Sequence, residues 1–229
     1  MPTRRTLALG GALLALCLVF ASAALAAGTK VSVRVEGVKR TLLSTTSVTT
    51  HSGSITKDGT PAGICPSSSA AGALDIATKH RWGGTFDTKF QELELTTILG
   101  ESWPFTQDKY YWGIWVNNRY ASAGMCQITP HKGDRILFAV DSDTTHEHPL
   151  GLSAPARATR GKAFKVKVVS YSDAGKATPL AGASIKGVSG TTDNRGALTV
   201  TDTHAGKLRL QASAKSHIRS ATETVTVKA

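Results

Sequence analysis

The sequence is poor in cysteine and has none of the patterns that usually mark an active site. It has no Gly-x-Ser-x-Gly nucleophile motif, no His-Glu-x-x-His zinc motif and no glycine-rich phosphate loop. Glu92 and Glu94 share one face of a predicted strand, but no flanking aromatic residues make them a glycosidase pair. We therefore predict a protein that is not an enzyme and needs no cofactor.

Long apolar runs are also absent after residue 27. Before that point, Arg4 and Arg5 precede an apolar run from Leu7 to Phe20, and Ala24-Leu25-Ala26 provides a small-x-small cleavage site. This pattern predicts a secretory signal peptide over residues 1–27 and a secreted or cell-surface protein. The mature chain is predicted to have no membrane span.

Of the three cysteines, Cys17 lies within the predicted signal, which leaves Cys65 and Cys126. An even number of cysteines in an oxidising compartment favours a disulfide. The bridge would close a loop of about 60 residues, which contributes ~4 kcal/mol in the chain-entropy description. No neighbouring His/Cys pattern favours a zinc site instead.

Acidic residues are scarce in the second half. Residues 30–149 hold 12 Lys and Arg and 12 Asp and Glu, whereas residues 150–229 hold 13 against 4. This asymmetry predicts two domains, the second of them basic. Outside the cell, a basic domain is expected to meet acidic envelope polymers, glycans or lipid head groups rather than nucleic acid. The alternative is a solvated basic surface that serves solubility.

The first domain is predicted over residues 30–141 as a small α+β unit. Val31, Val33 and Val35 alternate with polar residues, which indicates a half-buried strand. Further strands are predicted over residues 41–50, 90–95, 110–117 and 136–140, with a turn at Asn117-Asn118. The only predicted helix runs from Ser67 to His80, with Gly83-Gly84 after its end.

Residues 142–152 are polar and contain a proline, so they are predicted to be a linker. Residues 153–229 show short alternating segments separated by glycine turns, typical of an Ig-like antiparallel β-sandwich of about seven strands. The predicted fold class is mostly β (α+β).

Several motifs of the first half occur in an order that resembles the pattern of a known family. They comprise Cys65, the helix SSSAAGALDIATKH, Trp82-Gly83, the segment YYWGIWVNN, Gly124-Met125-Cys126 and Lys132-Gly133-Asp134. From Lys30 to Asp141 the chain resembles the transcobalamin-like C-terminal domain family of exported bacterial proteins. The resemblance implies a β-grasp-like fold. In transcobalamins this domain closes over a corrinoid against a large helical domain, which this chain lacks.

The second half resembles bacterial Ig-like and carboxypeptidase-regulatory-like modules. The resemblance rests on Pro179-Leu180-Ala181-Gly182-Ala183 and Thr192-Asp193-Asn194-Arg195-Gly196. It implies a role in display, spacing or adhesion. The outward residues of this half are a candidate polymer-binding face, formed by Lys165, Lys167, Lys186, Lys207 and Arg209. General solubility is the alternative if they divide between two sheets.

The aromatic strand 110–117 carries the candidate ligand site. A strand with large aromatic side chains on both faces buries them only if other parts of the protein pack against both faces. One face can pack on the helix, and the other either meets a second layer or stays exposed as a binding platform. The candidate ligand-binding residues are Trp103, Tyr111, Trp115, Asn117 and Tyr120.

His146-Glu147-His148 has ligand-type residues, but adjacent residues point apart, and we predict no metal site. The sequence thus favours an exported, non-enzymatic protein that binds an extracellular ligand or envelope component. The alternatives are a structural or adhesive surface protein without a small-molecule site, and an accessory module of a surface enzyme or transporter.

Overall fold

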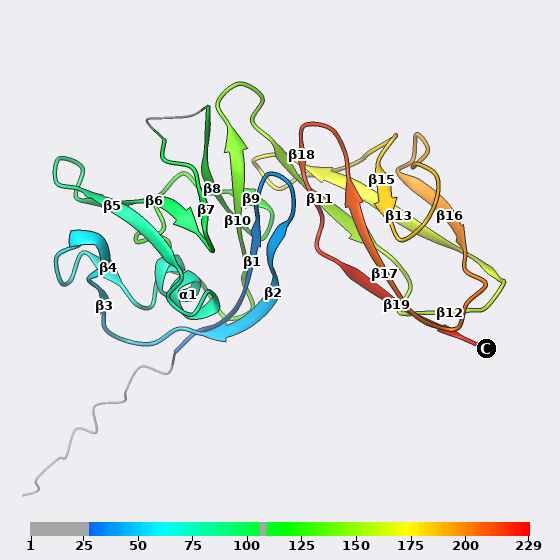
Figure 1. Cartoon of the computed structure of the whole chain (residues 1–229), viewed down its shortest axis with the longest axis horizontal. Helices are drawn as coiled ribbons and strands as arrows, with labels where there is room; N and C mark the ends of the chain where they lie inside the picture. Colours follow the sequence, from blue (N-terminus) through cyan, green and yellow to red (C-terminus); the bar gives the residue numbers. More distant parts are fainter. Residues whose placement is uncertain (1–27, 106–108) are drawn as a thin grey trace, which may run out of the picture.

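The computed structural model describes residues 28–105 and 109–229. The predicted signal peptide, residues 1–27, lies outside the described residues. Figure 1 shows two domains side by side along the long axis, the first built from β1 to β10 and the second from β11 to β19. Each domain has its own core of buried apolar side chains. The chain is mostly β, as predicted.

The first domain is organised around a five-stranded mixed sheet. Its order is β2 (Thr41–Thr49), β1 (Lys30–Glu36), β10 (Arg135–Ser142), β8 (Tyr110–Val116) and β9 (Arg119–Tyr120). The central strands β1 and β10 are parallel, and the other neighbours are antiparallel. Helix α1 (Ala70–Ala77) packs on one face, as in a β-grasp fold. The expected mostly β fold with one helix is confirmed.

A second, three-stranded sheet joins β5 (Trp82–Asp87), β6 (Glu92–Ile98) and β7 (Glu101–Ser102). Strand β5 was not predicted, because Gly83-Gly84 resembles a helix stop. The short strands β3 (Ser54–Ile55) and β4 (Cys65–Pro66) pair with each other, and the 3-10 turn η1 (Lys57–Gly59) lies between them. The predicted disulfide is confirmed, since Cys65 and Cys126 are bonded across a sequence separation of 61.

The second domain is a sandwich of two sheets. One has the order β14-β13-β11-β18, with β16 also paired to β13, and the other has the order β12-β19-β17-β15. The strands run over His148–Ser153 (β11), Arg157–Thr159 (β12), Ala163–Tyr171 (β13), Ala177–Pro179 (β14), Ser184–Lys186 (β15), Ala197–Thr201 (β16), Gly206–Ser213 (β17), His217–Ile218 (β18) and Glu223–Lys228 (β19). Inward side chains of both sheets form its core.

The predicted linker is shorter than expected. Strand β11 begins inside it, at His148, and pairs with β13 from Leu150 onward. Leu150 and Leu152 are buried in the core of the sandwich. The proline at position 149 suggested a loop, but it lies at the second residue of the strand, outside the part that pairs with β13.

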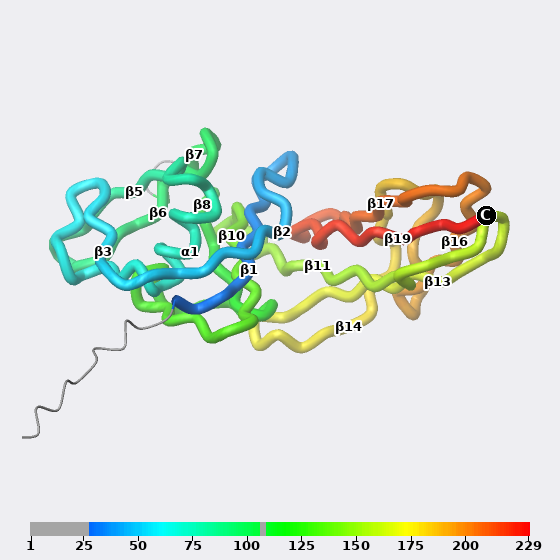
Figure 2. Tube along the Cα trace, turned by 90° about the horizontal axis from the view of Figure 1, so that it is seen from below, coloured from blue at the N-terminus to red at the C-terminus, as the bar shows by residue number. Residues whose placement is uncertain are grey.

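The second domain covers the face of the first sheet that lies opposite α1. Residues at alternate positions of β8 and β10 point to this side: Trp115, Leu137 and Ala139 form a separate buried cluster with Ile218 of β18. Trp115 is 0% exposed. Figure 2, turned by 90°, shows the same end-to-end contact between the domains.

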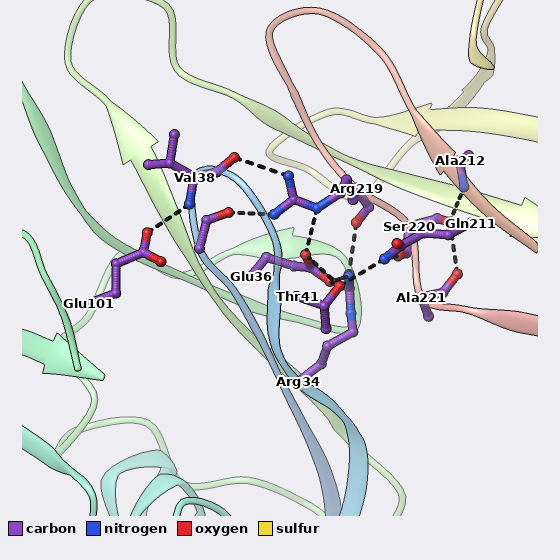
Figure 3. A network of polar contacts seen from close by, with 11 residues as sticks. Arg34, Glu36, Val38, Thr41, Glu101, Gln211, Ala212, Arg219, Ser220 and Ala221 are labelled. Carbon is purple, nitrogen blue, oxygen red and sulfur yellow. Dashed lines mark hydrogen bonds and ion pairs between the residues drawn. The ribbon is translucent and has the colours of Figure 1, made fainter. Parts of the chain in front are cut away.

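A buried polar network lies beside this apolar cluster (Figure 3). Glu36 of β1 is 1% exposed. Its carboxylate accepts hydrogen bonds from Arg34 Nη1 at 2.6 Å and from Thr41 Oγ1 at 2.9 Å, and from Arg219 Nε of the second domain at 3.0 Å. Arg219 also donates to the carbonyl oxygens of Gly37 and Val38.

The network continues from one domain to the other. Gln211 of β17 donates through Nε2 to Thr41 Oγ1 at 2.9 Å, and Arg34 Nη1 donates to the carbonyl of Arg219 at 2.9 Å. Burial lowers the pKa of Arg34 against the opposing charge of Glu36. One buried carboxylate thus holds cations from both domains, which fixes their mutual orientation.

Candidate functional site

A cavity in the first domain lies between the three-stranded sheet and the edge of the main sheet. Its volume is about 630 Å³. The wall comes from residues 92–95 of β6, residues 111–114 of β8, Tyr120 of β9, the loop residues 121 and 123–125, and Asp87, Phe90 and Phe105. This size is within the range of small-molecule sites.

Two exposed phenylalanines line the cavity. Phe90 is 69% exposed and Phe105 is 57% exposed, and they belong to the few large apolar side chains that the described residues leave in solvent. The ring of Phe105 makes an edge contact with Tyr111, with 5.9 Å between centroids. Trp112 and Leu93 lie deeper in the wall and are buried. The cavity therefore has an apolar base and an aromatic rim.

The charged residues of the wall are all acidic. Asp87, Glu92 and Glu94 contribute to it, and no Lys or Arg does. Glu94 Oε1 accepts a hydrogen bond from the backbone N–H of Phe105 at 3.1 Å, which ties the Phe105 segment to β6. Asp87 Oδ1 accepts the N–H groups of Lys89 and Phe90 and so shapes the turn that carries Phe90. A cationic or hydroxyl-bearing ligand fits such a wall better than an anion.

The edge of β8 adds backbone groups to the cavity. Strand β9 pairs only with Trp115 and Val116, the end of β8. Ile114 still faces that edge, because its carbonyl accepts the N–H of Ala121 at 2.9 Å. In an antiparallel strand, residues two apart direct their N–H and C=O groups to the same side. The backbone of Trp112 therefore faces the cavity edge, where no described strand pairs with it.

Two tyrosines connect the cavity to the domain boundary. Tyr111 and Tyr120 both line it, and their hydroxyls are 3.5 Å apart. Tyr111 donates to Asp141 Oδ2 at 2.9 Å. Burial, with Tyr120 and Asp141 beside it, raises the pKa of Tyr111, and burial likewise raises that of Tyr120. Both tyrosines thus act as neutral hydrogen-bonding groups.

The predicted ligand residues do not form one site. Of the five, the structure brings only Tyr111 and Tyr120 to the cavity. Trp115 is enclosed between the domains, beside Gly113, so its ring offers no binding surface. The sequence analysis left open whether a second layer covers this face of the strand. The second domain is that layer.

Trp103 and Asn117 lie elsewhere. Trp103 packs at the margin of the first core and donates from Nε1 to Glu101 at 2.9 Å. Asn117 turns the chain between β8 and β9 with φ of 52°, and its side-chain amide donates to Asp134 at 2.7 Å. Both have structural partners. Sequence reasoning missed Phe90, Phe105 and Trp112 as cavity residues, because their exposure and grouping are visible only in the structure.

The candidate polymer-binding residues divide between the two sheets of the sandwich. Lys165 and Lys167 are on β13, whereas Lys186 is on β15 and Lys207 and Arg209 are on β17. These strands belong to opposite sheets, and all five side chains are exposed. These five residues therefore form no single basic face. This arrangement favours the alternative that the basic residues serve general solubility.

A cluster of two histidines and one aspartate lies where the domains meet. His146 Nε2 is 2.8 Å from Asp173 Oδ1, and His148 Nδ1 is 3.4 Å from the same oxygen. His146 Nδ1 is 2.7 Å from Asp141 Oδ2. Burial opposes the charge of His146, but the carboxylates of Asp173 and Asp141 outweigh it and raise its pKa. Adjacent residues of this segment were expected to point apart; the two histidines, which are not adjacent, lie together, with 5.3 Å between their ring centroids.

Compared with known proteins, the chain matches no family model, and no curated protein matches it significantly in sequence. The resemblance to the transcobalamin-like C-terminal domain family therefore stays a prediction. None of the described helices has the length and apolar character needed to cross a membrane.

Proposed function

We propose that the protein is an exported, non-enzymatic binding protein, and that its ligand site is the cavity between β6 and β8. The observation that carries the proposal is the pair Phe90 and Phe105, two exposed rings beside a cavity of about 630 Å³. Soluble proteins seldom leave large apolar side chains grouped in solvent unless they contact a partner or ligand.

The wall chemistry supports a ligand class. Aromatic rings pack on a flat apolar surface, and the carboxylates of Glu92 and Glu94 accept hydrogen bonds from hydroxyl or cationic groups. The unpaired backbone edge at Trp112 adds a donor and an acceptor. An extracellular glycan fragment or a planar, neutral or cationic molecule of similar size has these features.

A ligand screen tests this proposal. The panel contains simple glycans, wall polysaccharides, muropeptides and corrinoids, with thermal shift and tryptophan fluorescence as readouts. We expect one class to raise the melting temperature and change the emission, and Trp112→Phe to remove that emission change. Phe90→Ala with Phe105→Ala should weaken binding by about tenfold or more, since each ring contributes on the order of 1–3 kcal/mol of apolar contact.

The matched control is Val38→Ala, another exposed apolar side chain that lies outside this cavity. It should leave binding unchanged. Binding that persists in the double phenylalanine variant, or that Val38→Ala weakens equally, would place the ligand elsewhere.

A structural or adhesive role is a second candidate. The observation that favours it is the fixed junction between the domains, in which Trp115 and the Glu36 network are buried. A rigid two-domain unit suits spacing or display at a cell surface. A panel without any thermal shift, together with salt-sensitive retention on acidic wall polymers, would favour this role.

A further inference from the structure

The path of the chain brings the side chains of His146 and His148 close together. His146 follows β10 in a turn with φ of 40°, and His148 is the first residue of β11. Glu147 between them points the other way, into the small cavity lined by Glu36 and Arg219. The positive φ of His146 turns the chain just before β11, and the two imidazole rings lie near each other, with 5.3 Å between centroids.

Asp173 completes the group from the turn between β13 and β14. The first domain holds this turn in place: the N–H of Tyr120 donates to the carbonyl of Asp173 at 3.0 Å, and Arg119 Nη1 donates to the carbonyl of Ala174 at 2.9 Å. The carboxylate of Asp173 is more than half exposed and free to adjust. One ligand-type atom from each of the three residues lies within 4.8 Å of the others.

Asp141 orients the first histidine. It is fully buried, and its Oδ2 lies 2.7 Å from His146 Nδ1. Its Oδ1 accepts the backbone N–H groups of Ser142 and Glu147 at 2.8 and 2.6 Å. A carboxylate that binds one ring nitrogen directs the other nitrogen outward, an arrangement common behind metal-bound histidines. His146 Nε2 therefore faces Asp173 and His148.

His148 supplies the second observation. Its Nδ1 is buried and makes no hydrogen bond within the described part of the chain, although it points toward Asp173. A buried ring nitrogen without a partner is costly unless something binds it. Asp173 Oδ1 lies 3.4 Å from this nitrogen.

We infer that His146 Nε2, His148 Nδ1 and the Asp173 carboxylate bind a Zn²⁺ ion, with Asp141 as the carboxylate behind His146. Tetrahedral zinc with bonds of about 2.0–2.1 Å needs ligand atoms roughly 3.3–3.5 Å apart. The 3.4 Å between His148 Nδ1 and Asp173 Oδ1 meets this, and the exposed Asp173 carboxylate would move back from His146 Nε2, now 2.8 Å away, to admit the ion. Imidazole ligands favour zinc over calcium and magnesium, which prefer oxygen. The ion would displace the proton shared by Nε2 and Asp173 to solvent.

The site would act as a clamp between the domains. Asp141 belongs to β10 of the first domain, whereas Asp173 belongs to the second. Zinc bound between His146 and Asp173 would tie the connecting segment to the β13–β14 turn. Three protein ligands leave a fourth position for water or for a donor from another molecule. This inference does not depend on the ligand proposed for the cavity.

Calorimetry on tag-free protein, stripped with a chelator, tests the site. We expect one Zn²⁺ per chain, and no heat with Ca²⁺. At zinc a hundredfold above the dissociation constant, the melting temperature should rise by about 5–10 °C. His148→Ala and Asp173→Asn should each weaken zinc binding at least about tenfold and remove most of this rise.

The control is His204→Ala, because His204 lies 3.4 Å from Asp202 but has no second histidine beside it. It should bind zinc like the parent protein. Asp173 is exposed, so Asp173→Asn should stay folded, as circular dichroism of the metal-free variant will show. No zinc heat in the parent protein, or parent-like binding by the folded Asp173→Asn and His148→Ala variants, would overturn the inference.

Discussion

Replacing Glu36 by glutamine tests whether one buried carboxylate holds the two domains together. Glu36→Gln keeps the size of the side chain but removes its charge. Arg34 and Arg219 then share a buried position without an anion, and one of the two acceptor oxygens becomes an amide that faces their N–H groups. We expect a large loss of stability, because the cost is that of leaving buried cations unpaired.

The magnitude follows from the burial of the group. Glu36 is 1% exposed and Arg34 is 9% exposed. Removing one partner of a buried ion pair costs about 3–5 kcal/mol. For a protein of this size, each kcal/mol lowers the melting temperature by roughly 2–4 °C, so the expected decrease is on the order of 6–20 °C. Such a loss is a large part of a typical total stability of about 5–15 kcal/mol.

Thermal and urea unfolding with the disulfide intact measure the effect. Glu223→Gln is the control, since its carboxylate makes no ion pair or hydrogen bond within the described residues, and it should change stability by less than about 0.5 kcal/mol. In the double variant with Arg219→Gln, the combined loss should be smaller than the sum of the single losses. A decrease below about 2 °C for Glu36→Gln would refute the reasoning.

Three further perturbations test other parts of the structure. Trp115→Ala should cost about 3–5 kcal/mol through a cavity between the domains, and unchanged urea unfolding would mean that the ring is not core. Replacing Cys65 and Cys126 by serine should cost ~4 kcal/mol, and a reduced wild-type sample should match that variant in the same unfolding experiment. Two backbone amides lower the pKa of the Asp193 carboxyl, so its contribution is present above the ordinary Asp pKa and lost as the pH falls through the lowered value. NMR titration should place that pKa below 3.8, and a value above 3.8 would contradict the turn geometry.

Local patterns predicted much of the first domain. The alternation at Val31, Val33 and Val35 corresponds to β1, and the aromatic run corresponds to β8. Two asparagines with positive φ form the predicted turn after β8. The helix is shorter than predicted, Ala70–Ala77 instead of 67–80, because its flanking residues form turns. These features depend on residues close in sequence, which is why the sequence was informative.

Features that depend on distant contacts were not predictable in this way. The burial of Trp115 requires Ile218, about a hundred residues later, and no local pattern reveals that contact. The histidine cluster is completed by Asp173, 27 residues from His146. The cavity wall includes Asp87 of β5. This strand was not predicted, because Gly83-Gly84 resembles the end of a helix. In each case the missing information was the partner surface, not the residue type.

The second domain covers the face of the first sheet opposite α1, and this contact limits which neighbouring domains the first domain can be joined to in evolution. A copy of the first domain that was joined to an unrelated neighbour would expose Trp115 and Leu137 as an apolar patch. It would also leave Glu36 without Arg219, the residue that follows β18. A deletion that removed Arg219 would likewise remove a partner of the Glu36 carboxylate. We expect the two halves to be inherited together, as one unit of recombination.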